Sequence, residues 1–94
     1  MNTPPTATIT APADGALFDP GEAITFSGSG SDAEDGDVTP SLVWVSSIDG
    51  EIGTGGSFSR SDLSVGVHLV TATATDSGGL TGSVAITITI SAIL

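Results

Sequence analysis

Residues 67–76 read Val-His-Leu-Val-Thr-Ala-Thr-Ala-Thr-Asp, and residues 82–90 read Gly-Ser-Val-Ala-Ile-Thr-Ile-Thr-Ile. Successive side chains of a strand point to opposite faces, so each stretch sorts its residues into two sets. In residues 84–90, one set is made of Val and Ile and the other of Thr and Ala. An apolar face opposite a threonine face is typical of an antiparallel sheet that is buried on one side and hydrated on the other. The two stretches therefore predict two long strands of such a sheet.

The same alternation continues outward in shorter segments, which Gly, Pro and Asp separate at turn positions. The strands that it predicts lie at 5–10, 22–29, 41–47, a short pair near 50–59, one near 60–64, 67–75 and 81–91. No window shows a convincing helical period. About seven short strands with turns every 8–12 residues predict an all-β protein, a Greek-key immunoglobulin-like β-sandwich of antiparallel strands.

The turn before the first of these long strands carries a further signal. Residues 62–70 read Asp-Leu-Ser-Val-Gly-Val-His-Leu-Val, so an aromatic ring follows Gly66 at a fixed distance. Immunoglobulin-like sandwiches place a Tyr here, and its hydroxyl group bonds to main chain a few residues upstream. His68 occupies that position in this chain. We therefore expect His68 on the core face, together with Trp44 and Phe26.

Length and charge limit the classes of function. The 94 residues suit one domain, 1–94, in which 1–4 act as a linker from a preceding module. The net charge is −10 and Arg60 is the only Lys or Arg, which argues against nucleic acid and anionic membranes as partners. Cysteine is absent, and no apolar run is long enough to insert into a membrane. We expect a monomer.

The acids are concentrated in residues 31–37, Ser-Asp-Ala-Glu-Asp-Gly-Asp, which hold four of the eleven carboxylates. In a sandwich of this topology, the N-terminus, this loop and the loop after residue 75 meet at one pole. Ca²⁺ binds six to eight such oxygen ligands, and the absence of His and Cys from this cluster argues against zinc or copper. The predicted calcium ligands are Asn2, Asp32, Asp35, Asp37 and Asp76. We expect Glu34 to point to solvent, and a solvated acidic loop that binds no ion remains the alternative.

Catalysis is not expected, so we interpret the chain as no enzyme. The only histidine, His68, lies near Ser59, Ser61, Ser64 and Asp62 in sequence, but no glycine elbow accompanies a serine. The acidic loop lacks an apolar pocket that would raise the pKa of one carboxyl group, as a glycosidase requires. Carbohydrate binding remains an alternative. Phe18 and Phe58 lie in or near turns, and their rings would have to be exposed to form a binding platform.

The whole chain resembles bacterial extracellular Ig-like repeats of the PKD-like and cadherin-like type. Four stretches carry the resemblance: NTPPTATITAP (2–12), ITFSGSGSDAEDGD (24–37), LVWVSS (42–47) and GVHLVTATATDSGGLTGSVAITITI (66–90). After its Trp, the chain keeps only Asp49-Gly50 of the longer turn motif that PKD domains usually carry, so the broader Ig-like class describes it best.

The resemblance implies a non-catalytic spacer or adhesion module in a secreted or surface-anchored multidomain bacterial protein. Neighbouring repeats of the same chain would be its partners, and an extracellular polysaccharide or a surface protein would be further ones. Related modules bind Ca²⁺ at the N-terminal pole, which implies Asn2, Asp32, Asp35 and Asp76 as ligands. The alternative function is a carbohydrate- or protein-binding accessory module of a secreted hydrolase.

Overall fold

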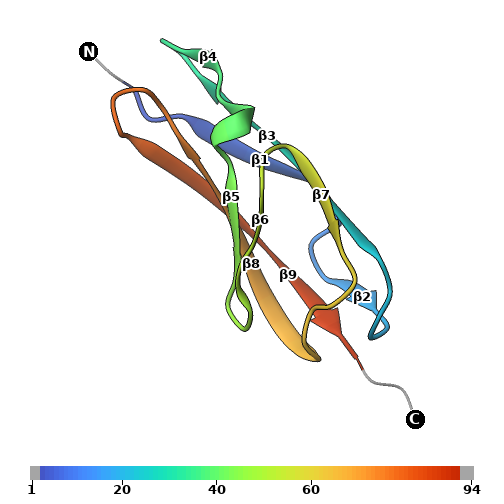
Figure 1. The fold of residues 1–94 in the computed structure, drawn as a ribbon. Coiled ribbons are helices and arrows are strands. Elements are labelled where there is room, and N and C mark those ends of the chain that lie inside the picture. Colours follow the sequence, from blue (N-terminus) through green and yellow to red (C-terminus); the bar gives the residue numbers. More distant parts are fainter. Residues whose placement is uncertain (1–2, 92–94) are drawn as a thin grey trace.

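The computed structural model describes residues 3–91 of the protein. Within them, nine strands form two sheets that pack face to face (Figure 1). The strands are β1 (Thr6–Ala11), β2 (Ala16–Phe18), β3 (Ile24–Asp32), β4 (Gly36–Asp37), β5 (Val43–Ser46), β6 (Gly50–Thr54), β7 (Ser57–Arg60), β8 (Gly66–Thr75) and β9 (Thr81–Ile90). A short 3₁₀ turn, η1 (Thr39–Ser41), precedes β5. This confirms the predicted all-β sandwich.

The two sheets share the strands unequally. One sheet has the order β1-β3-β4, with β7 also paired to β3, and the other has the order β2-β9-β8-β5-β6. The longest pairing joins β8 and β9 from Gly66 opposite Ile90 to Thr75 opposite Thr81. These are the two stretches with the strongest alternation in the sequence, and they form the middle of the larger sheet.

Three details of the predicted strand arrangement are wrong. The short strand β2 pairs with β9 in parallel, whereas the sequence pattern predicted antiparallel strands only. Two short strands do form near 50–59, but they do not pair with each other, because β6 pairs with β5 and β7 pairs with β3 in the opposite sheet. No strand covers 61–65, because the strand that pairs with β3 ends at Arg60. These assignments depend on contacts between distant segments, which local alternation does not report.

The core lies between the sheets and contains the predicted apolar face. His68, Val70, Ala72 and Ala74 of β8 are buried, as are Ile86, Ile88 and Ile90 of β9. Phe26 and Trp44 are fully buried, as expected, and their ring centroids lie 5.9 Å apart in an edge-to-face arrangement.

The half-buried Phe58 completes this aromatic cluster. Its ring stacks on Phe26 at 5.0 Å and meets Trp44 edge-on at 5.4 Å. A Cβ atom at Gly53 would lie only 2.5 Å from the Phe58 ring, so the glycine leaves the space that the ring fills. Phe58 is therefore part of the packing between the sheets.

The module is elongated, with principal dimensions of 54 × 18 × 18 Å. The start of β1, the β3–β4 turn and the β8–β9 loop lie at one end, and β9 finishes at the other (Figure 1). The first of these ends is called the N-terminal pole below. No helix in residues 3–91 is long and apolar enough to cross a membrane.

Candidate metal site

Three chain segments meet at the N-terminal pole, as the strand alternation predicted. Thr3, just before β1, bonds to Glu34 of the β3–β4 turn. Asp35 of the same turn accepts hydrogen bonds from the main-chain N–H of Ser77 at 2.7 Å and from its hydroxyl group at 3.0 Å. Ser77 belongs to the β8–β9 loop, so Asp35 links two loops that are 42 residues apart in sequence.

The β3–β4 turn is organised around Asp32, the last residue of β3. The Oδ2 atom of Asp32 accepts the main-chain N–H groups of Glu34 at 3.1 Å and Asp35 at 2.9 Å. Gly36 follows with φ +78°, a conformation that side-chain-bearing residues rarely adopt, and lets the chain fold back onto β3. The sequence Asp-Ala-Glu-Asp-Gly thus gives a tight turn whose first carboxylate faces inward.

Asp76 organises the β8–β9 loop in the same way. Its Oδ1 atom accepts the main-chain N–H groups of Gly78 and Leu80, both at 2.9 Å. Its main-chain N–H donates to the carbonyl group of Leu80 at 3.0 Å, which closes the loop. Each loop therefore uses one oxygen of one aspartate to fix its own backbone.

The second oxygen of each aspartate has no such use. Asp32 is 7% exposed and Asp76 is 6% exposed. The Oδ1 atom of Asp32 and the Oδ2 atom of Asp76 are buried without a hydrogen-bond partner among residues 3–91. Leaving a buried polar group unpaired costs about 1–3 kcal/mol, and more for a charged group. A bound cation would compensate both of these oxygens.

Asp35 lies beside the two buried aspartates. One carboxylate oxygen from each of Asp32, Asp35 and Asp76 falls in a group whose members are within 4.8 Å of one another. Ca²⁺ binds oxygen at about 2.3–2.6 Å, so ligands on opposite sides of one ion lie up to roughly 5 Å apart. The three carboxylates can thus contact a single Ca²⁺. Mg²⁺ requires shorter distances and a stricter octahedral arrangement.

No basic side chain neutralises this group. Arg60, the only Lys or Arg, donates to Asp62 at 2.7 Å and 3.1 Å and to the carbonyl group of Ile52 at 2.7 Å. Those bonds join β6 to the segment after β7. The carboxylates of Asp32, Asp35 and Asp76 therefore repel one another without compensation from any Lys or Arg.

Of the other two predicted ligands, the structure describes Asp37 alone. Asp37 is exposed, and its Oδ1 atom accepts the hydroxyl and main-chain N–H groups of Thr39, which lower the pKa of Asp37. It does not belong to the group of three carboxylates. Asn2 lies outside the described residues.

Sequence reasoning missed two residues at this pole, Thr3 and Ser77. Glu34 is exposed, as predicted, but Thr3 binds both of its oxygens, and hydrogen bonds from Thr3 lower its pKa. Ser77 holds Asp35 in place. Neither contact has a local sequence signal, because each joins segments that only the fold brings together.

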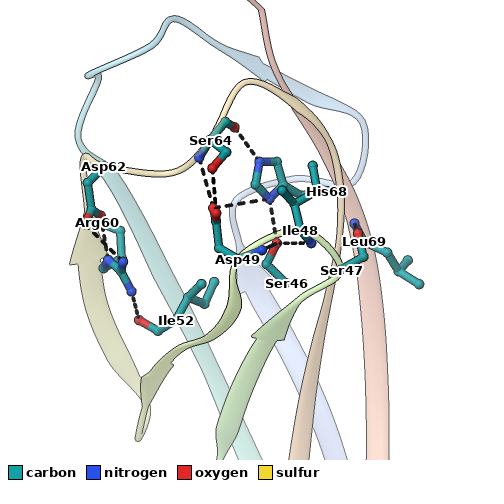
Figure 2. A network of polar contacts seen from close by, with 10 residues as sticks. All are labelled: Ser46, Ser47, Ile48, Asp49, Ile52, Arg60, Asp62, Ser64, His68 and Leu69. Carbon is teal, nitrogen blue, oxygen red and sulfur yellow. Dashed lines mark hydrogen bonds and ion pairs between the residues drawn. The ribbon is translucent and has the colours of Figure 1, made fainter.

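A second polar network lies at the other end of β8 (Figure 2). The Nδ1 atom of His68 is 2.6 Å from the hydroxyl group of Ser46, and its Nε2 atom is 2.6 Å from the carbonyl group of Ser64. Asp49 accepts the hydroxyl group of Ser64 at 2.6 Å and its main-chain N–H at 2.9 Å, which lower the pKa of Asp49. The imidazole is fully buried, with both nitrogens in hydrogen bonds. His68 thus ties the corner before β8, as its position in the sequence predicted.

Comparison with known proteins agrees with this architecture. The fibronectin(III)-like modules of Clostridium thermocellum CbhA match with a TM-score of 0.79 and 18% sequence identity. The alignment covers 95% of this chain and 47% of that one, so the chain spans about half the length of the solved structure. A search of curated proteins gives no match.

The sequence also matches a protein family directly. The family described as "Bacterial Ig domain" matches residues 5–62, from the segment before β1 to just after β7. This range includes the β3–β4 turn with Asp32 and Asp35, and the aromatic cluster of the core. The chain is therefore a member of the bacterial Ig domain family.

Proposed function

We propose that this Ig-like module is a non-catalytic spacer in a secreted or surface-anchored multidomain bacterial protein, and that one Ca²⁺ stiffens its N-terminal pole. The observation that carries the calcium half is the pair of buried, unpartnered carboxylate oxygens of Asp32 and Asp76, with Asp35 beside them. A hard cation with flexible coordination suits three carboxylates and surrounding water.

The ion would join two loops that, among residues 3–91, are linked by the hydrogen bonds of Ser77 to Asp35. Asp32 and Asp35 come from the β3–β4 turn, whereas Asp76 comes from the β8–β9 loop. The β3–β4 turn joins two strands of one sheet, and the β8–β9 loop joins two strands of the other. A shared Ca²⁺ therefore ties the sheets together at one pole and removes the repulsion that otherwise pushes the loops apart.

The shape of the module supports the spacer half. Its length is about three times its width, at 54 Å against 18 Å. The chain enters β1 at the N-terminal pole and leaves β9 at the other end (Figure 1). Modules of this form, joined end to end, hold neighbouring domains apart, and bacterial Ig-like modules are commonly extracellular accessory domains.

The alternative function, a carbohydrate-binding accessory module, requires exposed aromatic rings. Phe26, Trp44 and Phe58 contact one another inside the sandwich, and the Trp44 indole donates its N–H to the carbonyl group of Gly55 at 2.8 Å. Phe18 is half-buried against the core. The aromatic residues thus favour the spacer over a sugar platform, and no pocket is hollowed in the described part of the chain.

Thermal unfolding tests the calcium site. A ligand that binds only the folded state stabilises it by about 2.7 kcal/mol at a hundredfold excess over Kd. In a domain of this size, that raises the midpoint by roughly 10 °C or more. The protein is unfolded in calcium chloride, in magnesium chloride and in EDTA at matched ionic strength. We expect a rise that is specific to calcium in the unmodified chain.

Two variants make the comparison site-specific. Asp76→Asn removes the charge of a buried candidate ligand, whereas Asp37→Asn removes the charge of an exposed acid that bonds only to Thr39. We expect the calcium response to be lost in Asp76→Asn and kept in Asp37→Asn. Equal midpoints in calcium and EDTA for the unmodified chain would reject the calcium site and leave a plain spacer.

A further inference from the structure

Glu34 makes an unusual contact with the chain that enters the module. The main-chain N–H of Thr3 donates to Oε1 of Glu34, and the hydroxyl group of Thr3 donates to Oε2, both at 3.0 Å. One residue therefore uses both of its available donors on the two oxygens of one carboxylate. Bidentate contacts of this kind fix orientation as well as distance. The contact joins residues that are 31 positions apart.

Glu34 is itself held by the candidate metal site. Its main-chain N–H donates to Oδ2 of Asp32, the aspartate whose other oxygen is buried without a partner. The neighbouring Asp35 is fixed by the same Asp32 oxygen and by Ser77. A continuous series of hydrogen bonds thus runs from Thr3 through Glu34 to Asp32. Asp32 thus holds the backbone that carries Glu34.

A second contact anchors the entering chain two residues later. Pro5 is buried, and a Cβ atom at Gly82 of β9 would lie only 1.9 Å from its carbonyl oxygen. The main chain at Pro5 therefore lies directly on β9. Proline fixes φ near −65°, and both residues between Thr3 and Thr6 are prolines. A segment held at both ends and stiff in between has few directions open to it.

From these contacts we propose that Glu34 is a positioning residue, which holds the entering segment on the β3–β4 turn and so couples the direction of that segment to the carboxylates of the candidate site. The part that concerns ion binding rests on the proposed calcium function. The part that concerns Thr3 and Glu34 stands on the hydrogen bonds alone.

Glu34 is not a ligand in this scheme. Thr3 donors occupy both of its oxygens, and it is not in the group of carboxylates within 4.8 Å of one another. Its carboxylate points to the entering chain, whereas its main chain contacts Asp32. The two roles are therefore separable by mutation, because a side-chain change at Glu34 leaves its main-chain N–H in place.

Amide hydrogen exchange of Thr3, followed by NMR on the full chain, tests the proposal. Glu34→Gln keeps the size of the side chain but offers only one acceptor oxygen and no charge. Glu51→Gln is the matched control, because Glu51 is also exposed and lies on β6, away from the N-terminal pole. Each protein is measured in EDTA and in calcium chloride, and its Kd for Ca²⁺ is measured by calorimetry.

In EDTA, Glu34→Gln should speed exchange of the Thr3 amide by about threefold or more. The factor is modest because the lost hydrogen bond is exposed, and the free energy that such a bond contributes lies at the low end of the range for hydrogen bonds. Glu51→Gln should leave this exchange unchanged. Calcium should slow exchange of the Thr3 amide in the unmodified chain by a similar factor. It should slow this exchange by a smaller factor in Glu34→Gln. The Kd for Ca²⁺ should stay within about threefold in Glu34→Gln, because the ligands are intact.

Three results would overturn the proposal, in whole or in part. Equal Thr3 exchange in Glu34→Gln and the unmodified chain in EDTA would show that Glu34 does not hold the entering segment. A loss of calcium affinity in Glu34→Gln as large as in Asp76→Asn would make Glu34 a ligand and not a positioning residue. If the unmodified chain binds no Ca²⁺, the calcium half of the proposed function and the coupling are rejected together, and the EDTA comparison alone still decides whether Glu34 holds Thr3.

Discussion

The Nε2 atom of His68 lies 2.6 Å from the carbonyl oxygen of Ser64, four residues earlier in the chain (Figure 2). A carbonyl group only accepts, so Nε2 donates this hydrogen bond, and Nδ1 forms a second hydrogen bond with the Ser46 hydroxyl group. The Ser46 oxygen in turn accepts the main-chain N–H groups of Ile48 and Asp49. The histidine thus performs the corner-tying role that a tyrosine usually performs in immunoglobulin-like sandwiches.

Replacing this ring by Phe should destabilise the fold. His68→Phe keeps an aromatic ring in the core but leaves the Ser64 carbonyl and the Ser46 hydroxyl without their partners. Unpaired groups of this kind cost about 1–3 kcal/mol. We expect thermal unfolding to show a clearly lower midpoint. Val67→Thr, a change at the neighbouring exposed position of β8, is the control, and equal midpoints for the two variants would refute the role of His68.

Asp49 should make part of the stability depend on pH. The hydroxyl and main-chain N–H groups of Ser64 hold the pKa of Asp49 below its ordinary value. A carboxyl group with a lowered pKa in the folded state stabilises the fold above its unfolded pKa, and this contribution disappears as the pH falls through the folded value. Unfolding free energy should therefore fall below about pH 4.

Asp49→Asn isolates this contribution. Compared with the unmodified chain, the variant should be less stable at pH 7 and should lose less stability between about pH 4 and pH 2. Denaturant unfolding across this range gives both quantities. Asp19→Asn, at an exposed turn before β3, is the control. Parallel pH curves for Asp49→Asn and the unmodified chain would show that the bonds to Ser64 carry no pH-dependent stability.

Gly82→Ala should disturb the seating of Pro5. The new methyl group would lie 1.9 Å from the Pro5 carbonyl oxygen, so the entering chain or β9 must shift. Overpacking of this kind costs about 1–3 kcal/mol. Ser83→Ala, on the next and exposed position of β9, is the control. If Gly82→Ala unfolds at the same denaturant concentration as Ser83→Ala, the close approach of Pro5 to β9 is not what requires glycine at this position.

Much of the fold could be predicted, because its main strands alternate cleanly. The buried set of β8 and β9 is the apolar set of the sequence, and Trp44 and Phe26 lie in the core as expected. The meeting of three segments at one pole also followed from strand direction. The bonds of Thr3 to Glu34 and of Asp35 to Ser77 confirm that meeting.

The rest depends on register and side-chain direction, which the sequence pattern does not contain. The parallel pairing of β2 with β9 joins segments about 70 residues apart, with no local signal. Phe58 was a candidate for exposure because it lies near a turn. It packs inward because Gly53 leaves space for its ring. Asp37 lies in the predicted acidic loop, but its carboxylate accepts hydrogen bonds from the nearby Thr39 and is not grouped with Asp32, Asp35 and Asp76.

The most direct test of the central claim is a calorimetric titration of the chain with Ca²⁺. The unmodified protein, Asp32→Asn, Asp76→Asn and Asp37→Asn are titrated under the same conditions, with Mg²⁺ as the competing ion. The account predicts one calcium per chain, loss of binding in Asp32→Asn and Asp76→Asn, and retention in Asp37→Asn. It is contradicted if the unmodified chain shows no calcium heat, or if Asp37→Asn weakens binding as much as the two buried aspartates do.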